Sequence, residues 1–302
     1  MIKRFFLIFF SFIFLFSCEK DSDVIPDNNA PYYDGVNDVL IRNYVNRVFI
    51  DLLGREPLDN EMLVEVDTLK KNDLSLSSRI ALVHKLQTDT NFVSGDSSYT
   101  HAYYHQFYNM TKVRMIEGAS NEYLLGEMNN ELQRAYSDSL SGDMIGYYSH
   151  TYKANRYKNV VDSERKYMNG EIDINQVYTY MLDNPVYDLI NMNTFNFVNA
   201  SFDNLFFRFP TSTEFEAGYN MIEYNTSEFL MHQAGQSKTD YISILLSSDE
   251  FYEGMIIYAY KTFLARNPSS IEKYNLMQFF SIDKNYQKIE QFIMSTDEYA
   301  HF

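Results

Sequence analysis

One thirteen-residue pattern occurs three times in the chain, and it constrains the fold more than any other feature of the sequence. Each copy reads aromatic-x2-Φ-Φ-x-Arg-x-Pro-x3-Glu, where Φ is apolar, and the copies occupy residues 49–61, 202–214 and 260–272. Three copies in register within one chain are difficult to attribute to chance, and such repetition is typical of a recurring structural unit. The pattern therefore predicts three copies of one supersecondary element.

Each copy has the features of a corner between two helices. Upstream of the arginine, apolar residues recur at i, i+4, i+7 and i+8; in the first copy they are Val45, Phe49, Leu52 and Leu53. This spacing predicts a helix with one buried stripe. Proline disfavours helix at the residue before it and suits the first turn of the next helix. The residues expected to form the structural corners are Arg55, Pro57, Glu61, Arg208, Pro210, Glu214, Arg266, Pro268 and Glu272.

The arginine of each corner is expected at a helix C-terminus, where positive charge suits the helix dipole, and it can pair with the glutamate of its own copy. Binding of a ligand by the arginine is the alternative. Capping-box spacing occurs in the second and third copies, at Thr211 with Glu214 and at Ser269 with Glu272. Leu58 breaks this spacing in the first copy, which leaves Asp59 or Asn60 as the possible cap.

The pattern predicts an all-α fold of three helical corner repeats. The repeats are expected at residues 38–92, 195–251 and 252–302, with a helical, tyrosine-rich insertion at 93–194 between the first two. Breaks between helices are expected near Gly118, Gly142, Gly170 and Pro185. The segments 241–246 and 289–294 suit helix or strand by pattern alone, and the helical parent motif and the absence of hairpin signals favour helix.

Two motifs carry a resemblance to known families. Leu53-Gly54-Arg55-Glu56-Pro57 with Glu61, and the closing Ser295-Thr296-Asp297-Glu298-Tyr299, resemble a bacterial helical repeat of unknown function that is similar to the phycobilisome linker domain. The first copy also resembles the helical domain found beside cytochromes in planctomycete proteins. The resemblance covers roughly residues 41–92, 195–251 and 253–300 and implies a fold. The cytochrome analogy would imply electron transfer, but the chain has no Cys-x-x-Cys-His motif, so no haem or other cofactor is expected.

The N-terminus has the layout of a secretory signal. Lys3 and Arg4 precede an apolar run at residues 5–16, which is too short to span a membrane because a spanning helix needs about 20 residues. Cys18 is the only cysteine of the chain, and it follows Leu15-Phe16-Ser17, which resembles the lipobox of bacterial lipoproteins. The resemblance implies a signal peptide at 1–17 and lipid on Cys18. An ordinary signal peptide that ends beside a cysteine is the alternative.

The segment after the cysteine indicates where the protein is located. Residues 18–37 are acidic and turn-rich, which predicts a flexible tether. The acidic run directly behind Cys18 resembles the surface-export signal of Bacteroidetes lipoproteins. It implies a protein anchored by lipid in the outer membrane and exposed on the cell surface. A solvated linker is the alternative, and the segment can be both.

The charge balance argues against one class of partner. The chain has 41 acidic and 25 basic residues and a formal charge of −16; loss of residues 1–17 would remove Lys3 and Arg4 and leave −18. Nucleic acids bind through Lys and Arg, so no nucleic-acid partner is expected. With Cys18 acylated, no thiol would remain for disulfides, metal thiolates or a cysteine nucleophile.

Catalytic and metal-binding motifs are scarce. His101 and His105 have one-face helical spacing and, with Glu117, Glu122 or Glu127, are weak candidates for a metal site; an ordinary histidine pair is the alternative. The chain has no His-Glu-x-x-His, Gly-x-Ser-x-Gly or phosphate-cradling glycine motif. No catalytic residue is therefore assigned.

These observations favour a non-catalytic, lipid-anchored envelope protein that binds or scaffolds another envelope protein or a surface polymer such as a polysaccharide. Tyrosines of the insertion would suit a recognition surface, and a buried helical stripe is the alternative. Hydrolysis of an extracellular polymer is the alternative function, and a redox partner is a third.

Overall fold

The computed structural model describes residues 35–93 and 97–302. The chain divides into two units, residues 1–37 and 38–302, and the elements below belong to the second. The expected leader at 1–17, Cys18 and most of the expected tether at 18–37 lie outside the described residues. No helix among the described residues combines the length and the apolar character that crossing a membrane requires.

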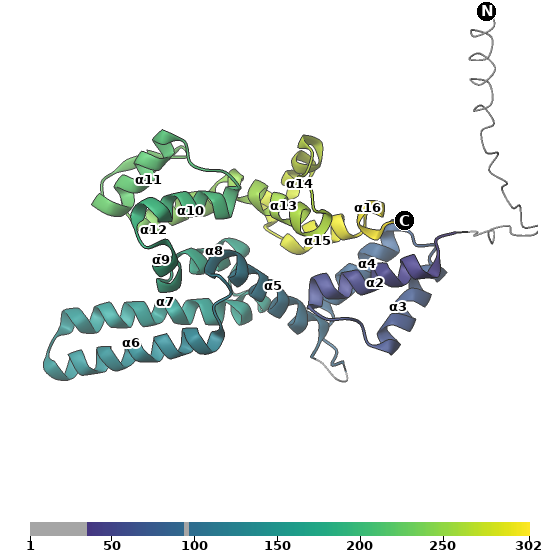
Figure 1. The fold of residues 1–302 in the computed structure, drawn as a ribbon, viewed down its shortest axis with the longest axis horizontal. Coiled ribbons are helices and arrows are strands. Elements are labelled where there is room, and N and C mark those ends of the chain that lie inside the picture. The colour runs from purple at the N-terminus through teal and green to yellow at the C-terminus, as the bar shows by residue number, and fades with distance from the viewer. Residues whose placement is uncertain (1–34, 94–96) are drawn as a thin grey trace, which may run out of the picture. The chain divides into compact units, whose positions relative to one another are not determined.

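The described part of the chain is all-α, as the sequence predicted, with 15 helices and one small pair of strands (Figure 1). The first helices are α2 (Asp38–Leu53), α3 (Asp59–Lys71), α4 (Leu76–Thr88) and α5 (Tyr99–Ile116). They are followed by α6 (Asn121–Ser141), α7 (Met144–Met168), α8 (Ile174–Leu182) and α9 (Pro185–Asn191). Then come α10 (Thr194–Phe206), α11 (Ser212–Tyr224), β1 (Glu228–Leu230), β2 (Gln233–Gly235) and α12 (Lys238–Ser247). The last are α13 (Asp249–Leu264), α14 (Ser270–Asp283), α15 (Tyr286–Met294) and α16 (Asp297–Ala300).

Local capping explains where many of these helices begin. At the N-termini of α4 to α8, the side-chain oxygen of the N-cap residue accepts a hydrogen bond from a backbone N–H of the first turn. These N-cap residues are Ser75, Ser98, Ser120, Asp143 and Asp173. The breaks predicted near Gly118, Gly142, Gly170 and Pro185 all fall between helices. Segments 241–246 and 289–294 are helical within α12 and α15, also as predicted.

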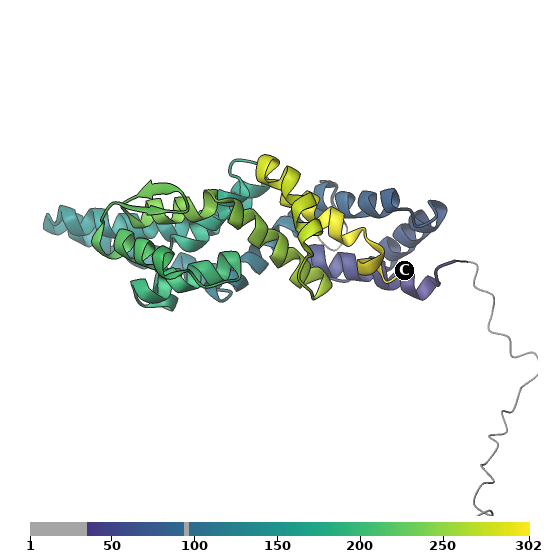
Figure 2. The ribbon, with the colours of Figure 1, turned by 90° about the horizontal axis from the view of Figure 1, so that it is seen from above.

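The strands β1 and β2 were not predicted. They form an antiparallel hairpin in which Leu230 pairs with Gln233 (Figure 2). The two turn residues, Met231 and His232, have φ of 48° and 65°. A two-residue turn of this kind normally carries Asn-Gly or Asp-Gly, so the usual sequence signal is missing here.

The apolar stripes of the three corner segments supply much of the core. The stripe residues of the first copy are buried, and so are those of the second, Val198, Phe202, Leu205 and Phe206. In the third copy Ile256, Tyr260 and Phe263 are buried and Leu264 is half-buried. Helix α5 packs on α2, α13 packs on α10, and α16 packs on α13. Helix α13 approaches α10 closely at Gly254, where a Cβ would lie 1.9 Å from the Leu205 carbonyl oxygen. Close packing of α10 and α13 therefore requires glycine at this position.

The tyrosines of the insertion divide between the two expected roles. Tyr103, Tyr108, Tyr178 and Tyr187 are buried and belong to the core, on α5, α8 and α9. Tyr136, Tyr148 and Tyr152 are exposed, on α6 and α7.

Candidate functional site

The arginine and glutamate of each corner form a bidentate ion pair, with two N–H···O hydrogen bonds. The pairs and their two N···O distances are Arg55–Glu61 (2.7 and 2.8 Å), Arg208–Glu214 (2.9 and 2.8 Å) and Arg266–Glu272 (3.0 and 2.7 Å). Each arginine also donates to the backbone carbonyl of the residue that follows it. Hydrogen bonds from Arg208 and Arg266 are the main cause that lowers the pKa of Glu214 and of Glu272 to about 2.

The residue after each corner proline (Pro57, Pro210, Pro268) is the N-cap of the second helix. The second and third corners have the expected capping boxes, at Thr211 and Ser269. The first corner differs from the expectation, because its N-cap is Leu58 rather than Asp59 or Asn60. The Glu61 carboxylate accepts the Leu58 N–H at 2.6 Å and so satisfies the helix end without a polar cap.

Arg208 and Arg266 each have a second acidic partner that the motif did not reveal. Arg208 binds Glu250 at the start of α13, at 2.7 Å, and Arg266 binds Glu298 of α16 at 2.6 Å. In the first corner, the hydroxyl of Tyr99 donates to Glu61 at 2.8 Å. The guanidinium groups of the corner arginines are therefore engaged in hydrogen bonds within the protein. This does not favour a ligand-binding role for them.

The two histidines that the sequence singled out lie on one face of α5. His101 and His105 lie on consecutive turns of α5 with ring centroids 6.5 Å apart. The Nδ1 atom of His105 lies 2.9 Å from Glu164 of α7, and its Nε2 atom lies 3.0 Å from the Asn109 amide. Among the described residues no three His, Cys, Asp or Glu side chains are grouped so that they could hold a metal ion.

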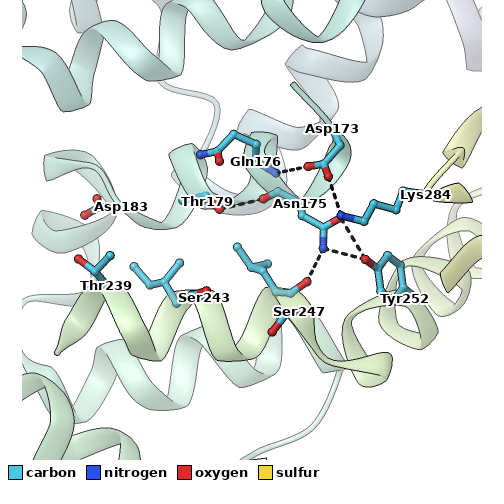
Figure 3. Close-up of a pocket in the computed structure, with 12 residues that line it drawn as sticks. Asp173, Asn175, Gln176, Thr179, Asp183, Thr239, Ser243, Ser247, Tyr252 and Lys284 are labelled. Carbon is cyan, nitrogen blue, oxygen red and sulfur yellow. Dashed lines mark hydrogen bonds and ion pairs between the residues drawn. The ribbon is translucent and has the colours of Figure 1, made fainter. Parts of the chain in front are cut away.

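A polar groove of about 640 Å³ lies between α8 and α12, and the sequence did not predict it. We call it the α8–α12 groove. Figure 3 shows the side chains of α8 facing those of α12 across it. Its polar lining consists of Asp173, Asn175, Gln176, Thr179, Asp183, Thr239, Ser243, Ser247, Tyr252 and Lys284.

Asn175 holds the two sides of the groove together. Its Nδ2 atom donates to the Leu246 carbonyl oxygen near the end of α12 and lies 2.9 Å from the Tyr252 hydroxyl on α13. The Tyr252 hydroxyl in turn lies 3.2 Å from Asn175 Oδ1. The amide therefore connects three helices that are distant in sequence, and it makes the groove a consequence of tertiary packing.

The charged groups of the groove are paired. Lys284 donates to Asp173 at 2.7 Å, and Asp173 also accepts the Gln176 N–H at 2.9 Å as the cap of α8. Burial raises the pKa of Asp173, but these two hydrogen bonds outweigh it and keep the pKa below its ordinary value. Asp183 pairs with Arg156 of α7 at 2.8 Å. Both lining carboxylates are thus held by cations.

The uncharged groups differ from the charged ones, because several are available to a ligand. The side chains of Gln176, Thr239 and Ser243 make no hydrogen bond to any residue that the structure describes, and Thr239 and Ser243 are exposed. On α12, hydroxyls recur every fourth residue at Thr239, Ser243 and Ser247, which places them on one helix face. This spacing is the one sequence signal that could have revealed the site.

A buried carboxyl group is the other chemically unusual feature. Glu290 of α15 is 5% exposed, and burial raises its pKa to about 8. Its Oε2 atom accepts from Tyr103 at 2.7 Å and from Gln87 at 2.8 Å. The adjoining cavity, which Asp51 also lines, measures about 20 Å³, room for about one water molecule. A polymer substrate does not fit into a cavity of this size.

Comparisons with family models, curated proteins and solved structures found no match to this chain. The resemblances to the phycobilisome-linker-like repeat and to the cytochrome-associated domain therefore rest on the sequence motifs alone.

Proposed function

We propose that this protein is a lipid-anchored envelope protein that binds a surface polysaccharide without cleaving it, and that the α8–α12 groove is the binding site. The observation that carries the proposal is the set of uncharged side chains in the groove that have no partner in the described protein, namely Gln176, Thr239 and Ser243. A volume of about 640 Å³ is in the range of known ligand sites.

The chemistry of these groups supports a neutral, hydroxyl-rich ligand. Hydroxyl and amide side chains both donate and accept hydrogen bonds, as the hydroxyls of a sugar do. On α12 the hydroxyls lie one helical turn apart, about 6 Å for four residues of helix. Regular spacing of this kind suits a polymer with a short repeat. The lining has two carboxylates and one lysine, so its charge does not favour an anionic polymer.

Binding is favoured over hydrolysis because both carboxylates of the groove are paired with cations. Glycoside cleavage needs one carboxyl group that stays protonated and a second that is ionised. Asp173 is held ionised by Lys284, and Asp183 is paired with Arg156. The carboxyl group with a strongly raised pKa, Glu290, is enclosed in the core and does not line the groove.

The sequence motifs at the N-terminus support the anchoring part of the proposal. Cys18 in a lipobox-like context and the acidic run behind it suit a surface lipoprotein, and a surface polysaccharide would then be within reach. Replacement of Cys18 by serine should move the protein from the membrane fraction to the soluble fraction and abolish incorporation of labelled palmitate. Membrane retention of this variant would contradict the anchor.

The binding site is tested with the full chain purified in detergent and a panel of neutral polysaccharides, by affinity electrophoresis. A variant with Gln176→Ala, Thr239→Val and Ser243→Ala should bind at least about tenfold more weakly, because each lost hydrogen bond contributes about 1 kcal/mol. Thr213→Val, at an exposed threonine of α11 outside the groove, is the matched control. Equal affinity of the triple variant and the control would refute the proposed site.

A further inference from the structure

One end of the α8–α12 groove borders on a network of ion pairs. Figure 3 shows Asp183 at the opposite end of the groove from Lys284. Arg156 of α7 binds Asp183 at 2.8 Å and Asp188 of α9 at 2.9 Å. Asp188 also accepts a hydrogen bond from Lys238, the first residue of α12. The network therefore joins α7, α9 and α12 at the Asp183 end of the groove, and its two cations balance its two carboxylates.

An aromatic ring lies against this network. Tyr152 is on α7, the second helix of the α6–α7 hairpin, one helical turn before Arg156 (Figure 1). The guanidinium carbon of Arg156 lies 5.5 Å from the centre of the Tyr152 ring, which is a cation–π contact. Burial raises the pKa of the Tyr152 hydroxyl, and the negative charge of Asp183 raises it further. The ring is therefore close to a carboxylate that lines the groove.

The Tyr152 ring is held in place and is still accessible. Its exposed fraction is 54%, whereas the Arg156 side chain beside it is only 12% exposed. Two carboxylates fix the position of that guanidinium, and charge-assisted hydrogen bonds of this kind have a defined geometry. Tyrosine offers a large contact area at a low cost in conformational entropy. Tyr152 thus has the properties of a preformed binding surface at the end of the groove.

The chemistry of this surface suits one face of a sugar ring. In a pyranose whose hydroxyls are equatorial, the axial C–H groups point to the two faces of the ring, which are therefore apolar. Such a face can pack on an aromatic ring while the hydroxyls at its edge form hydrogen bonds with polar side chains. The ion-pair network beneath Tyr152 carries no net charge, which matches a neutral sugar.

We propose that Tyr152 is a stacking platform at the Asp183 end of the α8–α12 groove, on which one pyranose ring of the bound polysaccharide packs. This inference rests on the proposed function and narrows the ligand to neutral polymers of pyranose units with equatorial hydroxyls, such as glucans. The polymer lies along the hydroxyls of α12 and continues past Asp183 onto α7.

The test measures binding of the full chain, purified in detergent, to the neutral glucans hydroxyethylcellulose, laminarin and pullulan by affinity electrophoresis. Tyr152→Ala should weaken binding about fivefold, since a stacked ring contributes about as much as an aromatic pair. Tyr152→Phe keeps the ring and should bind within about twofold of the wild type. Tyr136→Ala, at a 67% exposed tyrosine of α6, is the matched control and should bind like the wild type.

The outcomes separate this inference from the proposed function. If the wild type binds none of the three glucans, the inference fails and, for glucans, so does the proposed function. If the triple groove variant loses binding and Tyr152→Ala does not, only the stacking inference fails. Equal losses in Tyr152→Ala and Tyr152→Phe would also overturn it, because they would assign the contact to the hydroxyl rather than to the ring.

Hydroxyl-radical footprinting with mass spectrometry tests the contact without any substitution. A glucan that the protein binds should lower the ratio of oxidation at Tyr152 to oxidation at Tyr136, because the bound sugar covers one ring and not the other. An unchanged ratio with bound glucan would overturn the inference even if the variants were unstable.

Discussion

Replacement of Glu290 by glutamine should stabilise the protein at neutral pH. The Glu290 carboxyl group is buried among α4, α5 and α15, and its pKa is about 8 in the folded protein against an ordinary value of 4.5. Only Oε2 accepts the hydrogen bonds from Tyr103 and Gln87. The amide oxygen of glutamine can accept both, so the substitution preserves the hydrogen bonds and removes the titrating group.

The magnitude follows from the difference between the two pKa values. Because the folded-state pKa is raised, the stability contribution of Glu290 is fully present below pH 4.5 and is lost as the pH rises through 8. At pH 7 the loss amounts to about 3 kcal/mol, at about 1.4 kcal/mol for each unit between 4.5 and 7. Glu290→Gln should recover this amount at pH 7 and little at pH 4, where the wild-type side chain is already neutral.

The assay is chemical denaturation followed by circular dichroism, with wild type and variant compared across pH 4 to pH 9. Glu216→Gln, at an exposed glutamate of α11, is the matched control and should change the free energy of unfolding by less than about 0.5 kcal/mol. If Glu290→Gln destabilises the protein at pH 7, or if its effect does not grow between pH 4 and pH 8, the carboxyl group is not held neutral and the reasoning fails.

Three further outcomes follow from the corners. Arg266→Ala removes the hydrogen bonds to Glu272 and Glu298. We expect the free energy of unfolding to fall by about 1 kcal/mol and the melting temperature by about 2–4 °C. An unchanged melting temperature would argue against a structural role. Ala265 has a φ of 53°, so Ala265→Gly should relieve backbone strain and stabilise by about 0.5 kcal/mol in the same melts, whereas destabilisation would show that the strain is absent. Because the pKa of Glu214 is lowered to about 2, the contribution of this carboxylate to stability is present above pH 4.5 and is lost as the pH falls through 2. Glu214→Gln should therefore reduce the loss of stability at acidic pH, measured in a denaturation series.

Much of the local structure was predictable because its determinants lie within a few residues of one another. The stripe of Val198, Phe202 and Leu205 repeats with the period of a helix, and the period alone indicated the face that is buried. The capping box at Thr211 and the pairing of Arg208 with Glu214 depend on spacings of three and six residues. The β1–β2 hairpin was not predicted because its turn residues are Met231 and His232, whereas turns of this kind are usually recognised by Asn-Gly or Asp-Gly.

The candidate site could not be predicted, because each of its parts depends on residues that are distant in sequence. Asn175 reaches the carbonyl oxygen of Leu246, 71 residues away, and that contact is part of what brings α8 and α12 together. The raised pKa of Glu290 depends on its enclosure by helices from three parts of the chain. A composition of many carboxyl groups gives no indication of which one will be buried.

By itself, the sequence determined that the chain is helical, where many of the helices begin and end, and which faces of the corner helices are apolar, because backbone capping and helical periodicity are local. Only the tertiary structure decided the partners of those faces: it buried Tyr178, left Tyr148 exposed at the hairpin, and opened a polar groove beside Ser243. The physical reason is that burial depends on which helices pack together, and that choice is made by shape and contact over the whole chain.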